Sequence, residues 1–183
     1  MKHTSTRTVI LAALLAAFTT VATMMIKFPT PTLGYIHLGD GLVLLCGVLL
    51  GPGMGAAAAG IGSMLADLFS GYAAFAPATL IIKALTAFVG GWVFHHLHAS
   101  AFRTPVRTIL GGIPAECVMV LGYYLYEAGM MVVGGSSFAA ALSATAAGVP
   151  FNIVQGAVGV ILSVVLLPVL ARASGELDAR IRA

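Results

Sequence analysis

Long runs of apolar residues occupy most of this chain, and charged side chains are almost absent from them. Only 8% of the residues are charged, whereas a soluble domain carries about a quarter. A water-facing surface cannot be built from so few charges, and the mean hydropathy of +1.04 is typical of a chain that faces lipid. Because a helix needs about 20 apolar residues to cross the hydrocarbon layer, the 183 residues have room for roughly five to seven spans. We therefore expect an all-α membrane protein.

The apolar runs and the breaks between them predict a single transmembrane domain over residues 1–183, built as a six-helix bundle. The expected helices cover about residues 8–26, 38–50, 54–69, 76–95, 108–128 and 148–171. A Gly-Pro-Gly tripeptide at residues 51–53 separates the two shortest runs, which would alternatively form a re-entrant hairpin. The first run has features of a secretory signal, but it is longer than a signal core and leads into further apolar residues. We interpret it as a transmembrane helix.

Basic residues lie mostly in the loops and ends on one side of this predicted bundle. They are Lys2, Arg7, Arg103, Arg107, Arg172, Arg180 and Arg182, whereas only Lys27 lies in a loop on the other side. Because cytoplasmic loops carry an excess of positive charge, this distribution places both the N and C termini in the cytoplasm. The basic residues form no stripe or cluster of the kind that binds nucleic acid, so nucleic acid is not an expected partner.

Several polar and ionisable side chains fall within or at the ends of the predicted helices, although each charge costs about 2.5 to 3.5 kcal/mol in a bilayer. Most fall in the half of the bundle opposite the termini, which indicates an outward-facing pocket rather than a continuous pore. Glu116, near mid-membrane, is the outlier, and Glu127 is expected to cap the outer end of its helix. The candidate substrate-binding residues are His37, Asp40, Asp67, Tyr72, Lys83, Glu116, Glu127, Asn152 and Gln155.

A purely structural role is the alternative for the same residues. Lys83 would then pair with Asp67 or Glu116. Asn152 and Gln155, which are i and i+3 neighbours on one helix face, would tie their helix to its neighbours. A lysine that pairs with an acid can still contact a ligand, so both interpretations stay open at this point.

Motifs for catalysis or metal binding are missing from the sequence. It has no phosphate-binding loop, nucleophile elbow or zinc-protease motif, so we expect neither an enzyme nor a bound cofactor. His95, His96 and His98 fall at the cytoplasmic end of a helix, where imidazoles suit the helix dipole, and we do not assign them to a metal site. Cys46 and Cys117 are expected to be small buried apolar residues.

Small residues recur at four-residue spacing in the first and third predicted helices, where such faces allow helices to pack closely. The pairs are Ala12 and Ala16, Ala13 and Ala17, Gly55 and Ala59, and Ala58 and Gly62.

Five segments carry a resemblance to a known family. They are residues 35–41 (YIHLGDG), 49–52 (LLGP), 66–72 (ADLFSGY), 82–84 (IKA) and 150–155 (PFNIVQ). Together they resemble the substrate-binding S components of energy-coupling-factor (ECF) transporters, over most of the chain. The resemblance implies a six-helix protein of the prokaryotic cell membrane. It would capture a water-soluble vitamin on its outer face, using the loop after the first helix and the outer halves of the last three helices.

The resemblance also implies partners. The small-residue face at Ala12, Ala13, Ala16 and Ala17 would dock on a transmembrane coupling subunit, and two separate ATPase subunits would hydrolyse ATP. The expected solute is a ring-bearing precursor, hydroxymethylpyrimidine or pyridoxine-like, or else pantothenate. A stand-alone carrier or channel for a small solute is the main alternative, and a membrane scaffold whose polar groups only join helices is a further one.

Overall fold

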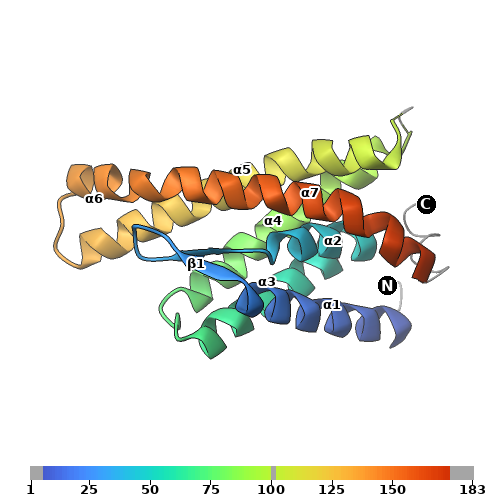
Figure 1. The fold of residues 1–183 in the computed structure, drawn as a ribbon, viewed down its shortest axis with the longest axis horizontal. Helices are drawn as coiled ribbons and strands as arrows, with labels where there is room; N and C mark the ends of the chain where they lie inside the picture. The colour runs from blue at the N-terminus through green and yellow to red at the C-terminus, as the bar shows by residue number, and fades with distance from the viewer. Residues whose placement is uncertain (1–5, 100–101, 174–183) are drawn as a thin grey trace.

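The computed structural model describes residues 6–99 and 102–173, and the chain is mostly helical over these ranges. The long helices lie side by side, and α1 begins at the same end of the bundle at which α7 ends (Figure 1). In chain order the elements are α1 (Thr6–Met25), β1 (Lys27–Pro29), β2 (Tyr35–His37), α2 (Asp40–Leu50), α3 (Pro52–Ser70), α4 (Ala76–His96), α5 (Thr104–Val133), α6 (Phe138–Thr145) and α7 (Val149–Ala173). Short 3-10 turns at Leu97–Ala99 and Ala146–Gly148 follow α4 and α6.

Four stretches of the described chain are long and apolar enough to cross a membrane. They are Thr6–Met25, Ala76–His96, Thr104–Val133 and Phe138–Arg172, the last of which joins α6 and α7. The pair α2 and α3 makes up the rest of the bundle, so the predicted number of six spans depends on these two helices and stays a prediction. So does the orientation of the termini, because Lys2, Arg180 and Arg182 lie outside the described residues.

Helix α2 forms the centre of the bundle. It has 11 residues, which is about 16 Å at 1.5 Å per residue, and almost every one of its side chains is buried. It contacts α1, α3, α4 and α7, and residues 43–46 are at most 2% exposed. A helix that is apolar on all sides belongs in the interior of a bundle, and this explains why so short a helix suffices here. Gly51, with a φ of 80°, and Pro52 then end α2 and start α3.

A small hairpin follows α1 and was not predicted. Strands β1 and β2 pair antiparallel, with Phe28 opposite Ile36, and only Ile26 separates α1 from β1. The hairpin lies along the bundle on the side away from the start of α1 (Figure 1). Strand β1 is exposed, whereas β2 ends at the buried His37.

Helix α5 is longer than the predicted range of 108–128 at both ends. The predicted range began directly after Arg107, but this residue lies within the helix and is only 5% exposed. Its guanidinium donates from Nε and Nη2 to the Phe94 carbonyl oxygen of α4, at 3.2 and 3.1 Å. Glu127 is likewise within α5, so the expectation that it caps the outer end of the helix was wrong. The separate helix α6 was also missed.

Candidate functional site

Side chains from six parts of the chain converge beneath the hairpin, where they line a small outer cavity of about 20 Å³. The lining comes from the hairpin, α3, the loop after α3, α4, α5 and α7. The residues are Thr30, Gly34, Tyr35, His37, Asp67, Phe75, Thr79, Tyr123, Glu127 and Asn152. Such a volume holds about one water molecule, so the hairpin closes this site almost completely.

Aromatic rings form one wall of the outer cavity and extend to its mouth. The Tyr35 ring of β2 lies 4.5 Å from the ring of Tyr72, centroid to centroid. Phe75 then contacts Tyr72 and Tyr126 edge-on, at 6.2 and 5.5 Å. The Lys27 ammonium lies 5.7 Å from the Tyr35 ring centroid and 5.9 Å from that of Tyr72. These cation–π contacts help to hold the hairpin against the loop after α3.

Two side-chain hydrogen bonds order the polar side of the cavity. The Tyr35 hydroxyl donates to Asp67 Oδ1 at 2.6 Å, and the hydroxyls of Thr79 and Tyr123 lie 3.1 Å apart. Burial, followed by the neighbouring Asp67, raises the pKa of Tyr35 far above its usual value, so this hydroxyl remains a donor. The second oxygen of Asp67, Oδ2, is buried and accepts no hydrogen bond from the part of the chain that the structure describes.

A buried ion pair lies next to the outer cavity. The Lys83 ammonium of α4 donates to Asp40 Oδ1 at the start of α2, and both side chains are 0% exposed. The same ammonium lies 5.2 Å from the centroid of the Tyr123 ring, which lines the cavity. The sequence-based alternative paired Lys83 with Asp67 or Glu116, and this pairing was wrong. The charge of Lys83 is thus already compensated by Asp40.

Gln155 of α7 connects this ion pair to the hairpin. Its Nε2 donates to Asp40 Oδ2 at 2.6 Å, and its Oε1 accepts from the backbone N–H of His37 at 2.8 Å. The Gly39 N–H donates in turn to His37 Nδ1 at 3.0 Å. Burial, together with the nearby Lys83 charge, lowers the pKa of His37 to about 3, so its imidazole is neutral and can accept this bond.

Glu116 of α5 is a second acid beside the same ion pair. An added Cβ at Gly159 would lie 2.8 Å from Asp40 Cβ and 3.3 Å from Glu116 Oε1, so both acids lie against this glycine of α7. Both Glu116 oxygens are buried without a hydrogen-bond partner among the described residues. These side chains, Asp40, Lys83, Glu116 and Gln155, form a polar cluster that contains two acids and one lysine.

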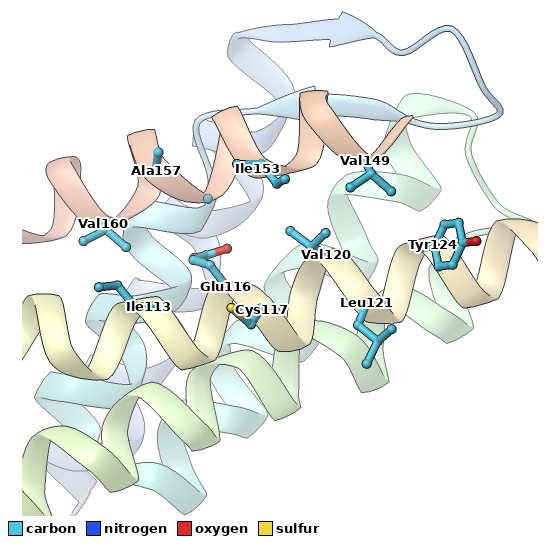
Figure 2. Close-up of a pocket in the computed structure, with 11 residues that line it drawn as sticks. Ile113, Glu116, Cys117, Val120, Leu121, Tyr124, Val149, Ile153, Ala157 and Val160 are labelled. Carbon is cyan, nitrogen blue, oxygen red and sulfur yellow. The ribbon is translucent and has the colours of Figure 1, made fainter. Parts of the chain in front are cut away.

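A larger apolar groove of about 570 Å³ runs between α5 and α7. Figure 2 shows its walls, with Ile113 and Val160 at one end, Tyr124 and Val149 at the other, and Glu116 between the two helices. Cys117 also lines this groove and is exposed, which corrects the expectation that both cysteines are buried; Cys46 is buried. Because the carboxyl oxygens of Glu116 are themselves buried, the groove offers apolar surface almost alone.

The predicted site residues therefore form two layers. Four of them, His37, Asp67, Glu127 and Asn152, line the outer cavity, and Tyr72 lies at its mouth against Tyr35. The other four, Asp40, Lys83, Glu116 and Gln155, form the polar cluster next to it. Sequence reasoning did not select the remaining lining residues. Their signal was weak, because a Tyr, Thr or Gly in a helix or a short loop is common in any membrane protein.

The two alanine pairs of α1 differ in exposure. Ala12 is buried and Ala16 half-buried, and an added Cβ at Gly62 would lie 2.5 Å from the Ala16 carbonyl oxygen. This pair therefore packs inside the bundle against α3. Ala13 and Ala17 are exposed and lie on the outer surface of α1.

A metal site is not expected from the geometry of the described ranges, which bring no three His, Cys, Asp or Glu side chains together to hold an ion. His96 Nδ1 contacts the Trp92 carbonyl oxygen at 3.0 Å, and His95 Nε2 contacts that of Val48 at 3.1 Å. These two imidazoles thus have backbone partners at the end of α4.

Comparison with known proteins finds a family, a relative and a solved structure that are similar to this chain. A family model described as "ECF-type riboflavin transporter, S component" matches residues 3–172. A protein of Pyrococcus woesei, described as uncharacterized, is 43% identical over 105 residues, which are 57% of this chain and 67% of that protein. A structure described as "Structure and mechanism of the S component of a bacterial ECF transporter" superposes with a TM-score of 0.66 and 24% sequence identity. It covers 91% of this chain and 96% of that one, and at this identity the likeness concerns the fold.

Proposed function

Because the chain belongs to the family of S components of ECF-type riboflavin transporters, we propose that it captures a ring-bearing vitamin, with riboflavin as the first candidate. S components are the substrate-binding membrane subunits of ECF transporters, and they are not enzymes. The proposed binding site is the outer cavity beneath the hairpin. The observation that carries the proposal is the convergence there of Tyr35, Phe75 and Tyr123 with the polar groups of Asp67, Glu127 and Asn152.

The chemistry of the cavity favours a flat ring with hydrogen-bond donors. Aromatic side chains provide stacking surface, while carboxylate and amide oxygens accept from N–H and O–H groups. Riboflavin has both a fused ring and a hydroxylated chain, and hydroxymethylpyrimidine and pyridoxine are smaller ligands of the same kind. Pantothenate would bring a carboxylate, for which the engaged Lys83 offers no free charge. This argument ranks pantothenate last among the solutes expected from the sequence.

Entry of any of these ligands requires movement of the hairpin, which forms the cover of the outer cavity. A cavity of about 20 Å³ is far smaller than a vitamin, and the hairpin together with the loop that holds Tyr72 forms its outer wall. The helices below are joined by the buried ion pair, whereas β1 is exposed on both sides. We therefore place the movement in the hairpin and not in the helices.

The proposed partners are a transmembrane coupling subunit and two ATPase subunits, in the cell membrane of a prokaryote. Ala13 and Ala17 are the better candidates for the docking face, because Ala12 and Ala16 already pack within the bundle. Separate ATPases agree with the absence of a phosphate-binding loop from the sequence. We keep six spans and cytoplasmic termini as part of this proposal.

A thermal-shift screen of the detergent-solubilised protein tests the substrate. A ligand that binds only the native state raises the midpoint of thermal unfolding by mass action. We expect riboflavin to raise it, and hydroxymethylpyrimidine, pyridoxine and pantothenate to raise it less. A larger shift with one of the other three would reassign the substrate, and no shift with any water-soluble vitamin would reject vitamin capture.

Reconstitution separates the proposal from a stand-alone carrier or channel. The purified chain in liposomes is expected to bind riboflavin without moving it along a gradient, because transport needs the coupling and ATPase subunits. Flux of the vitamin through liposomes that contain this chain alone would favour the carrier.

A further inference from the structure

One buried amide joins the cover of the outer cavity to the core of the bundle. Gln155 is 4% exposed, and its amide bonds reach residues more than a hundred positions away in the chain. Its oxygen accepts from the His37 N–H and its nitrogen donates to Asp40 Oδ2, while the same nitrogen lies 3.8 Å from Met119 Sδ. A side chain with two fixed partners in a buried position has one orientation available to it.

The hairpin is held differently at its two ends. The Thr30 and Thr32 hydroxyls bond to each other at 3.0 Å within its tip, and the tip lies against α5, where an added Cβ at Gly34 would be 2.9 Å from Glu127 Oε1. Its inner end, His37, is 7% exposed and is held from within the bundle by Gln155. The bond to Gln155 is therefore the point at which the position of β2 is tied to α7.

The other partner of Gln155 is equally constrained. Asp40 Oδ1 accepts from Lys83 and Asp40 Oδ2 accepts from Gln155, so α2, α4 and α7 meet at one carboxylate. Moving β2 away from α7 breaks the bond between the His37 N–H and the Gln155 oxygen and leaves both groups without this partner. If Gln155 follows the hairpin, the unpaired group is Asp40 Oδ2 instead. Both outcomes are unfavourable, since a buried polar group without a partner is costly.

We propose that Gln155 is a positioning residue, whose amide fixes the inner end of the hairpin to the Asp40–Lys83 pair and thereby sets how tightly the hairpin closes the outer cavity. This inference rests on the proposed function, because it treats the hairpin as the cover of a substrate site. It adds that a ligand that moves the hairpin on entry also changes the hydrogen bonding of Asp40, in the centre of the bundle. The ion pair and the cover then act as one unit.

Distance measurements on the ligand-free protein test the link directly. Spin labels on Leu33→Cys at the hairpin and Ser143→Cys on α6, in a Cys117→Ala background, report the position of the cover. Gln155→Met keeps the length of the side chain but removes both hydrogen bonds. We expect the distance distribution to become broader and to shift to longer distances. Gln155→Asn retains an amide that is one methylene too short to reach both partners, and we expect the same shift from it.

Two variants serve as controls for this measurement. His37→Ala removes the imidazole but keeps the backbone N–H that donates to Gln155 Oε1, so the hairpin should move less than in Gln155→Met. Ser163→Ala removes a buried hydroxyl from the same helix, whose bond is to Val160 within α7, and should not move the hairpin. Unchanged distributions in Gln155→Met and Gln155→Asn would overturn the positioning role, and so would an equal shift in Ser163→Ala.

Binding kinetics with riboflavin add a readout that a merely structural residue would not change selectively. Loss of the link is expected to raise the dissociation rate constant about tenfold, because an unfixed cover releases the ligand sooner. The midpoint of thermal unfolding without ligand should fall in Gln155→Met as well, because Asp40 Oδ2 and the His37 N–H lose their partner. The selective readout is therefore the dissociation rate constant, which Ser163→Ala should leave unchanged. An unchanged dissociation rate constant would contradict the inference. If the unmodified protein does not bind riboflavin but Gln155→Met still frees the hairpin, the substrate assignment fails while the positioning role stands.

Discussion

At the residue scale, the Asp40–Lys83 pair dominates the energetics of the polar cluster. Both side chains are fully buried, and removing one partner of such a pair typically costs about 3–5 kcal/mol because the other charge stays behind uncompensated. Lys83→Met is therefore expected to lower the midpoint of thermal unfolding strongly. The double variant Asp40→Leu/Lys83→Met should recover most of the loss. A double variant as unstable as the single one would mean that the pair contributes more than charge compensation.

Glu116 gives the opposite prediction. Its carboxyl oxygens have no hydrogen-bond partner among the described residues, and Lys83 is already paired with Asp40. Glu116→Gln keeps the volume and removes a group that can carry charge, so thermal stability should be unchanged or higher. A large drop in the midpoint of thermal unfolding would show that Glu116 is charged and is stabilised by the neighbouring Lys83.

His37 makes stability depend on pH. Burial lowers its pKa in the folded protein to about 3, whereas the unfolded chain takes up this proton near pH 6.5. Between pH 6.5 and about 3 the unfolded state therefore binds more protons, and stability falls as the pH falls, by up to about 1.4 kcal/mol per pH unit. Above pH 6.5 both states are neutral and this dependence vanishes.

Thermal unfolding over this pH range checks the contribution of His37. His37→Asn replaces the acceptor Nδ1 with an amide oxygen that does not titrate, and the fall in stability below pH 6.5 should become shallower. Equal pH profiles for the two proteins would assign the dependence to other groups.

At the element scale, helix α1 presents two faces that the sequence could not distinguish. The Thr20 hydroxyl donates to the Gly62 carbonyl oxygen at 2.8 Å, which fixes the rotation of α1 against α3 and leaves Ala13 and Ala17 outside. Ala17→Leu should leave riboflavin binding intact but reduce co-purification with the coupling subunit. Ala157→Leu, at an exposed position of α7, is the matched control. Equal co-purification of all three proteins would place the docking face elsewhere.

The long helices could be predicted from the sequence because lipid requires long apolar segments, and α1, α4 and α7 lie within a few residues of the expected ranges. The hairpin could not, since strands of three residues leave no periodic pattern. The choice between Asp40, Asp67 and Glu116 as the partner of Lys83 was also beyond the sequence. It depends on how α2 is placed between α4 and α7, and hydrophobicity does not specify that placement.

At the scale of the whole molecule, the orientation in the membrane is open to a direct test. The hairpin and the start of α5 lie toward opposite ends of the bundle (Figure 1). In intact cells, a membrane-impermeant maleimide should label Leu33→Cys but not Phe102→Cys, in a Cys117→Ala background. Labelling of Phe102→Cys alone would invert the proposed orientation, with the cavity then facing the cytoplasm.

The single residue between α1 and β1 has a consequence for the assembled transporter. Only Ile26 separates α1, the helix proposed to meet the coupling subunit, from the hairpin that covers the cavity. The hairpin therefore has little freedom to move without α1. A change in the angle of the hairpin when the vitamin binds is therefore expected to rotate or tilt α1. By reciprocity, a partner that prefers one angle of α1 must also alter vitamin affinity, by the same factor that the vitamin alters affinity for the partner.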